Sequence, residues 1–335
     1  MLFRSHVLQH SNGDGFLDAQ TIQDQVDVLN EDFQAIAGTP GGPGHNAKIR
    51  FRLASLDPEG NPTTGITYTT NDQWFNDQGN YGDSLTWDSN RYVNIFTNEA
   101  GGYYGYVNGF ASMGDYVGTP DDYVVINWQT VGRVGTPWWP GNLGRTGTHE
   151  IGHYVGLWHT FEGGCADSDC YADGDQICDT EPEASSASNC DSQQSSCGSP
   201  DPIHNYMDYT TDVCLWEFTP EQVNRARCTL QNWRPDVYAV VPPGRVDQLL
   251  AAKVGVDDIA WSWDADPSAA YYRVYTTENA DDPGRGDNPA ATLRCEATNG
   301  ATSCRHTGGQ SALPDLLFYQ AVGDCDTDAS DEGPN

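Results

Sequence analysis

Apolar residues recur at two different spacings in the first 140 residues, which predicts a mixture of helices and strands. A helix is expected after Asp18, because apolar residues then recur every three or four positions, at Ile22, Val26, Leu29 and Phe33. Short apolar runs predict strands at 3–10, 49–53, 92–96 and 123–128. This mixture is typical of an α+β fold.

Two further helices are predicted between residues 140 and 235. The first runs from Leu143 to about Gly156. The second begins at Thr219, which is followed by proline and then glutamine at positions suited to the first turn of a helix. Between them lies a polar, cysteine-rich segment, 165–201, which is long enough that we expect disulfides or ions to hold it.

The length of 335 residues favours two domains, and the pattern places a boundary near residue 240. Pro235 and the turn at 242–244 mark it, and short alternating strands follow. We expect an α+β domain at 1–240, a small all-β sandwich at 241–326 and a disordered tail at 327–335.

The composition limits the classes of partner. Lys and Arg number 16 and Asp and Glu 48, so the formal net charge is −32. Such an acidic chain is not expected to bind nucleic acid through its phosphates, and no apolar run is long enough to span a membrane. A solvated acidic surface is the simplest interpretation; calcium binding and a preference for basic substrates stay open.

Ten cysteines indicate an oxidising compartment. All of them follow residue 164, and none forms a CxxC pair, which argues for disulfides and against a cysteine zinc ribbon. Met1 to His10 lack the long apolar segment of a signal peptide. We therefore expect a secreted protein whose signal peptide and pro-segment lie outside this chain.

The segment from His149 to His159 carries the candidate chemistry. On a helix His149 and His153 lie one turn apart on one face, so both imidazoles can bind one metal ion. The carboxylate of Glu150 can reach a water on that ion. Gly156 lets the chain leave the helix and bring back His159 as a third ligand.

Three protein ligands leave one position for water, which is the arrangement of a catalytic zinc. The ion lowers the pKa of this water towards ~7 and polarises a peptide carbonyl, while Glu150 takes the proton and passes it to the leaving amine. A bare HExxH motif occurs often by chance, on exposed helices with two solvated histidines. The extended motif with Gly156 and His159 is far rarer and favours a zinc peptidase.

The extended motif resembles that of the metzincin clan, in which a turn containing methionine follows it. The sequence NYMDY at 205–209 fits that turn. The segments 144–148, 159–165 and 174–180 narrow the resemblance to the pappalysin family, including its ulilysin-like members. The similarity covers about residues 3–235. It implies a mixed twisted sheet with an active-site helix, and the activity of a secreted zinc endopeptidase made as a zymogen.

The resemblance also implies roles for single residues. It assigns the zinc ligands and the general base to His149, His153, His159 and Glu150. Met207 matches a methionine that forms an apolar floor under the metal, although a lone methionine more often packs in a core. Tyr209 matches a tyrosine that stabilises the oxyanion or touches the metal in the free enzyme; a buried structural tyrosine is the alternative.

A calcium site is a further implication of the resemblance. Asp175, Asp179 and Thr180 match an acidic segment that binds calcium in relatives, and oxygen ligands suit this cation. A solvated acidic loop is the alternative. The extra Glu181 before Pro182 departs from the Asp-Thr-Pro sequence of relatives and leaves the geometry of the loop open.

Four disulfides are expected, three of which involve cysteines of the cysteine-rich segment. The first two pairs follow from the resemblance, the third pair is what these leave, and the fourth flanks a predicted hairpin. The pairs are Cys165–Cys197, Cys190–Cys214, Cys170–Cys178 and Cys295–Cys304. Other pairings stay open, because spacing alone does not determine connectivity.

Two more resemblances concern binding surfaces. The strand at 123–128 resembles the metzincin strand that pairs with an extended substrate at a sheet edge, with an ordinary buried strand as the alternative. The C-terminal strands, which include Trp261, resemble a fibronectin type III module. Such a module suggests a surface or matrix ligand and has no catalytic role.

Three functions compete on this basis. A secreted zinc endopeptidase with protein or peptide substrates fits best, because Glu150 and all three histidines are present. An adhesion or matrix-binding protein with an inactive peptidase domain would usually have lost one of these four residues. A zinc hydrolase acting on a non-peptide amide is disfavoured by the methionine turn.

Overall fold

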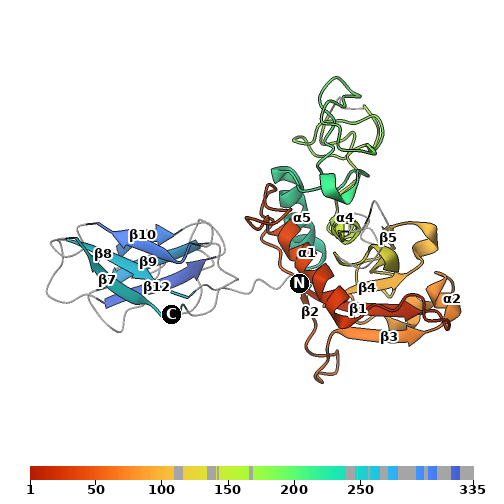
Figure 1. Cartoon of the computed structure of the whole chain (residues 1–335), viewed down its shortest axis with the longest axis horizontal. Helices are drawn as coiled ribbons and strands as arrows, with labels where there is room; N and C mark the ends of the chain where they lie inside the picture. Colours follow the sequence, from red (N-terminus) through yellow and green to blue (C-terminus); the bar gives the residue numbers. More distant parts are fainter. Residues whose placement is uncertain are drawn as a thin grey trace. The chain divides into compact units, whose positions relative to one another are not determined.

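The chain forms two compact units, Met1–Ala239 and Val240–Asn335, each with its own sheets (Figure 1). The computed structural model describes residues 1–108, 116–133, 141, 143–165, 169–237, 246, 248–255, 257–264, 271–277, 292–297, 301–307 and 318–324. The predicted boundary turn at 242–244 and tail at 327–335 lie outside the described residues.

A six-stranded sheet supports the first unit. Its strands are β1 (Leu2–Gln9), β2 (Arg52–Leu53), β3 (Ile66–Thr70), β4 (Val93–Asn98), β5 (Gly105–Val107) and β6 (Tyr123–Asn127). The order is β2-β1-β4-β6-β5, with β3 also paired to β1, and β5 is the antiparallel strand. Every residue of β4 and β6 is buried, as expected where both faces of a parallel sheet are covered.

Three longer helices pack in this unit: α1 (Ala19–Phe33), α4 (Arg145–Tyr154) and α5 (Pro220–Trp233). α1 packs against α4, and both lie on the same side of the sheet (Figure 1). Asp18 caps α1 and Thr219 starts α5 in a capping box, which confirms both predicted helix starts. Among the described residues, shorter helices are α2 (Asp72–Phe75), α3 (Tyr81–Leu85), η1 (Ala100–Gly102), η3 (Trp128–Thr130) and η4 (Asp212–Cys214).

A buried ion pair fixes α4 against α1. Arg145 Nη2 lies 3.0 Å from Asp32 Oδ1, and the hydroxyl of Thr148 donates to Asp32 Oδ2 at 2.6 Å. Both charged side chains are almost fully buried, so each compensates for the desolvation of the other. This contact holds the helix that carries the HExxH motif in a fixed position on the core.

The structure corrects two predictions about strands. In the predicted strand at 49–53, the paired residues are those of β2, the last two. The strand at 123–128 is not a sheet edge, because β6 lies between β4 and β5 and is fully buried. The alternative of an ordinary buried strand is therefore correct, and β5, which the sequence pattern did not predict, forms the outer edge.

The described part of the second unit is all β, as predicted. Its strands are β7 (Leu250–Val254), β8 (Asp258–Ser262), β9 (Tyr271–Thr277), β10 (Thr292–Ala297), β11 (Ser303–His306) and β12 (Phe318–Asp324). They form two antiparallel sheets, β10-β9-β12 and β11-β8-β7. Trp261 and Trp263 pack with Tyr272 and Val274, which joins the two sheets in one core. The fibronectin type III assignment stays a prediction.

The predicted hairpin around Cys295 and Cys304 is wrong. The disulfide between them is present, but β10 and β11 belong to different sheets, so it links the two sheets.

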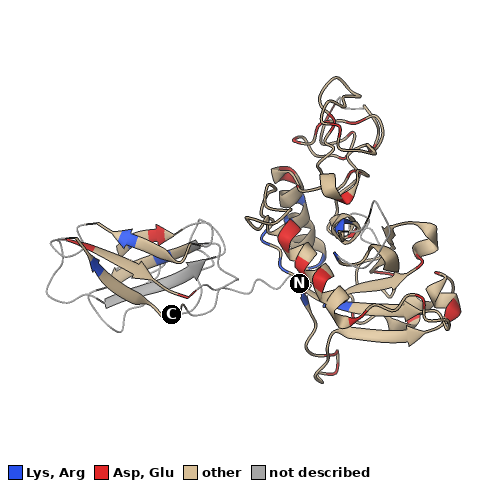
Figure 2. Ribbon diagram, in the orientation of Figure 1, with Lys and Arg blue, Asp and Glu red and all other residues tan. Residues whose placement is uncertain are grey.

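Acidic residues of the first unit are spread over its helices and loops (Figure 2). Within the described ranges, no helix has both the length and the apolar character needed to cross a membrane.

Candidate metal centre and active site

Three histidines converge beside the C-terminal half of α4. His149 and His153 lie one helical turn apart on α4, and His159 follows the end of the helix. The Nε2 atoms of His149 and His153 are 3.1 Å apart, and those of His153 and His159 are 3.0 Å apart. The predicted ligands therefore meet at one point, where three nitrogen atoms face each other.

The hydrogen bonds of the histidines direct their Nε2 lone pairs at this point. The Nδ1 atom of His149 donates to the carbonyl of Tyr206, and that of His153 to the carbonyl of Leu157, both at 2.7 Å. Each proton therefore sits on Nδ1, so the two Nε2 atoms present lone pairs that repel unless a cation lies between them. A tetrahedral zinc with bonds of about 2.0–2.1 Å holds its ligands roughly 3.3 Å apart, so the cluster fits zinc.

The protonation of the histidines also suits a metal. Burial lowers the pKa of His153 to about 4, and burial together with the neighbouring His153 lowers the pKa of His159 to about 3. Burial and the two neighbouring histidines lower the pKa of His149 well below its usual value. All three are neutral at pH 7, the form that binds a metal ion.

Close packing fixes the turn that brings back His159. Gly156 has a φ of +90°, and a Cβ atom there would lie 2.5 Å from Thr229 Oγ1. Gly152 is also required, because a Cβ atom would lie 2.4 Å from Met207 Sδ. Met207 is fully buried and contacts α4 at Gly152. The close packing around the motif therefore requires glycine at both positions 152 and 156.

Glu150 packs against β5, which forms one wall of the site. A Cβ atom on Gly105 would lie 2.7 Å from Cγ of Glu150 and 2.8 Å from the carbonyl of Val125. Oε2 of Glu150 is buried without a hydrogen-bond partner among the described residues, and burial raises the pKa of Glu150 to about 8. The Oε2 atom is therefore available for a ligand or a water molecule, because no described residue occupies it with a hydrogen bond.

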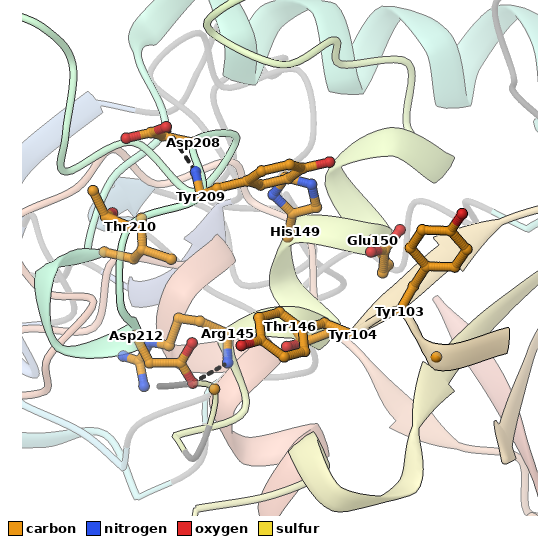
Figure 3. A pocket seen from close by; sticks show the side chains of 14 residues that line it. Tyr103, Tyr104, Arg145, Thr146, His149, Glu150, Asp208, Tyr209, Thr210 and Asp212 are labelled. Carbon is orange, nitrogen blue, oxygen red and sulfur yellow. Dashed lines mark hydrogen bonds between the residues drawn. The ribbon is translucent and has the colours of Figure 1, made fainter. Parts of the chain in front are cut away.

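A cavity of about 500 Å³ opens beside Glu150 (Figure 3). Its wall comes from the turn before β5 and the start of β5, from Gly141 and α4, and from the segment that runs from the methionine turn to Leu215 after η4. Lining residues include Tyr103, Tyr104, Thr146, His149, Tyr209 and Asp212. The hydroxyl of Tyr209 lies 3.0 Å from Nε2 of His159, and its ring is 55% exposed, so the alternative of a buried structural tyrosine is wrong.

Comparisons with known proteins agree with this geometry. A model of the Peptidase_M43 family, described as pregnancy-associated plasma protein-A, matches residues 80–231. The chain is 38% identical over 232 residues to an extracellular metalloprotease of Verticillium alfalfae, an alignment that covers 65% of this chain and 70% of the relative. It is 32% identical over 240 residues to extracellular metalloprotease 1 of Coccidioides posadasii, covering 68% and 76%. The chain belongs to the M43 peptidase family.

The fold agrees with this assignment. Mature mirolysin of Tannerella forsythia, solved in complex with a cleaved peptide, superposes with a TM-score of 0.59 and 31% identity over 71% of this chain and 95% of that one. The predicted family and α+β peptidase fold are confirmed. The M43 chain is a metalloprotease, and its extracellular relatives together with its disulfides confirm the predicted secreted location.

Three disulfides involve the cysteine-rich segment of this M43 peptidase, and one of them joins it to Cys214 of η4. They are Cys165–Cys197, Cys170–Cys178 and Cys190–Cys214, the pairs expected for this segment. The segment is anchored on α5, because Asp179 accepts from the hydroxyl of Thr219 and from the backbone N–H of Glu221. Asp179 thus caps the start of α5, whereas Asp175 is buried elsewhere in the loop. Sequence reasoning did not separate these two aspartates.

Replacing Gly105 with Ala in the M43 peptidase is expected to lower kcat/KM for peptide cleavage by about 10- to 100-fold. The added methyl group has to displace Glu150 or the backbone of β6, and a shift of about 1 Å at a reacting group can cost about 100-fold. Steady-state kinetics will measure the effect, beside zinc content and melting temperature. Unchanged kinetics in a folded, zinc-loaded variant would show that β5 does not confine Glu150.

Proposed function

We propose that this protein is a zinc-dependent endopeptidase that cleaves internal peptide bonds of extracellular proteins, with Glu150 as the general base. The observation that carries the proposal is the juxtaposition of three neutral histidines and one buried carboxylate whose Oε2 has no hydrogen-bond partner among the described residues. The mirolysin complex with a cleaved peptide supports protein or peptide substrates.

Each residue has a defined part in the reaction. His149, His153 and His159 would hold the zinc ion, which would supply a bound water of lowered pKa and polarise the peptide carbonyl. Glu150 accepts a proton from the attacking water and donates it to the leaving amine. Burial raises the pKa of Glu150 to about 8, which stabilises the protonated form that donates to the leaving amine, whereas a cation held by the histidines would favour the carboxylate form that accepts the proton.

Tyr209 is proposed to stabilise the negative charge that develops on the carbonyl oxygen. Its hydroxyl lies beside His159 Nε2, close to where the metal would be held, and its ring lines the cavity. A hydrogen bond to a developing oxyanion is strong because the donor is already in place before the reaction. In the free enzyme the same hydroxyl can lie next to the metal.

Calcium binding in the cysteine-rich loop is a further part of the proposal. Asp175 Oδ2 and Thr180 Oγ1 are buried, the two side chains are close enough to interact, and neither oxygen has a well-formed hydrogen bond among the described residues. Both residues line a cavity of about 10 Å³, which has room for a single ion. These oxygens support a small calcium site at Asp175 and Thr180. The capping bonds of Asp179 favour a structural role for that residue.

The surface or matrix ligand of the second unit stays a prediction from the sequence. The described part of that unit contains a packed apolar core and a disulfide between sheets, which suit a stable spacer or binding module. An inactive adhesion protein is disfavoured, because the histidines and Glu150 have the geometry that catalysis needs.

The endopeptidase assignment is tested by giving the purified, zinc-loaded chain an unfolded protein, a diverse peptide mixture and a panel of non-peptide amides. The products of the first two are then sequenced. We expect cuts at internal peptide bonds and no hydrolysis of the non-peptide amides. Release of single terminal residues, or activity confined to the non-peptide amides, would contradict the proposal.

A further inference from the structure

A turn at 99–104 places two exposed tyrosines on the rim of the active-site cavity. Tyr103 is 70% exposed and Tyr104 is 44% exposed. Both line the same cavity as His149 and Glu150 (Figure 3). The reaction proposed above uses neither ring, although large aromatic side chains are normally at least partly withdrawn from water.

The backbone of this turn has an unusual conformation. Ala100, Gly101 and Gly102 have φ values of 47°, 58° and 89°, so three consecutive residues are left-handed. Glycine tolerates this conformation, but alanine adopts it at a cost in free energy. Such strain persists where the surrounding structure enforces it, and it occurs preferentially at functional sites.

Two buried asparagines enforce the conformation. Asn98 and Asn127 are partners in register at the ends of β4 and β6. Asn98 Oδ1 accepts from the N–H of Ala100 at 2.7 Å. Asn127 Nδ2 donates to the carbonyls of Glu99 at 3.1 Å and of Tyr103 at 3.2 Å. The start and the end of the turn are therefore attached to neighbouring central strands.

A second set of hydrogen bonds connects Asn98 to the edge strand β5. Asp77 Oδ1 accepts from Nδ2 of Asn98 at 3.0 Å and from the hydroxyls of Tyr81 at 2.6 Å and Tyr106 at 2.9 Å. Tyr106 belongs to β5, which continues directly from the turn. The turn and the edge strand are thus held together, so the two exposed rings sit on a preorganised support.

We propose that Tyr103 and Tyr104 form a subsite that binds an aromatic side chain of the peptide substrate close to the cleaved bond. Exposed rings on a rigid turn offer offset or edge contacts to another aromatic ring. Little conformational freedom is lost on binding, because the turn is ordered beforehand. The inference rests on the proposed peptidase function, since it assigns a substrate preference to the same cavity.

The test uses peptides that differ by a single Ala-to-Phe replacement at each of three positions on either side of the cleaved bond. In the parent chain we expect Phe to raise kcat/KM on the order of 10-fold at one position. Tyr103→Ala and Tyr104→Ala should reduce this Phe-to-Ala ratio towards one. Tyr171→Ala, which removes a 66% exposed tyrosine from the cysteine-rich loop, should leave the ratio unchanged.

A binding experiment separates this inference from the proposed function. The Kd values of the same peptides are measured on Glu150→Gln, with and without Tyr103→Ala, so the result does not depend on cleavage. A parent that cleaves or binds without favouring Phe at any position would overturn the inference. A Phe preference that survives both tyrosine substitutions would also overturn it. Absence of cleavage with a Tyr103-dependent Phe preference in binding would refute the peptidase proposal and retain the subsite.

Discussion

Replacing Glu150 with Gln is expected to lower kcat for peptide cleavage by about 10²–10⁴-fold while zinc stays bound. Gln has nearly the same shape as Glu but cannot accept the proton of the attacking water. Glu150 is not one of the three histidines that converge at the candidate metal site, and its Oε2 has no hydrogen-bond partner among the described residues. Its replacement should therefore leave the fold and the metal site intact. Steady-state kinetics and metal analysis of the purified variant measure both effects.

A matched control is Glu59→Gln, which removes the same charge from an exposed loop position. It should retain the activity of the parent. If Glu150→Gln retained the parental kcat with zinc bound, another group would have to be the base. If it lost zinc, Glu150 would have a role in the metal site that the geometry does not indicate.

Replacing His153 with Ala is expected to remove zinc and, with it, at least about 10³-fold of the activity. His153 is the central ligand, since its Nε2 lies 3.1 Å and 3.0 Å from those of His149 and His159. The two remaining histidines cannot complete a three-ligand site. Metal content after dialysis and peptide cleavage are the measurements, and chelation of the parent followed by added zinc should reproduce the loss and its recovery.

His10→Ala provides the control, because His10 lies on the loop after β1 and its contacts are to Phe75, Asp72 and the turn backbone. It should keep both zinc and activity. Full cleavage by zinc-free His153→Ala would refute a metal-dependent mechanism. Retention of zinc with normal affinity would show that a different residue completes the site.

Much of the active centre is determined by local sequence. The four-residue spacing of His149 and His153 places both on one helix face in any α-helix. Gly156 allows the left-handed turn that returns His159, and the structure has this conformation there. The starts of α1 and α5 were predictable for the same reason, since capping side chains bond to backbone only two or three residues away.

The wall of the cavity formed by β5 and the turn before it was not predictable in this way. β5 has three residues, which are too few to show the alternation of apolar and polar residues that predicts a strand. Its pairing with β6 in the structure identifies it as a strand. The same pairing decided that 123–128 is an interior strand. Tyr103, Tyr104 and Tyr209 reach one cavity from segments about 100 residues apart, which no local pattern encodes.

Long-range contacts also decided the chemistry of side chains that look alike in the sequence. Asp175 and Asp179 are four residues apart in one acidic loop, yet Asp179 caps α5 while Asp175 is buried beside a small cavity. Cys295 and Cys304 are close enough for a hairpin, but they lie in different sheets. The sequence by itself determined the three candidate metal ligands, because their spacing acts within one helix and one turn. The tertiary structure decided the wall of the cavity, the surroundings of each loop carboxylate and the place of this disulfide, because each depends on contacts between distant segments.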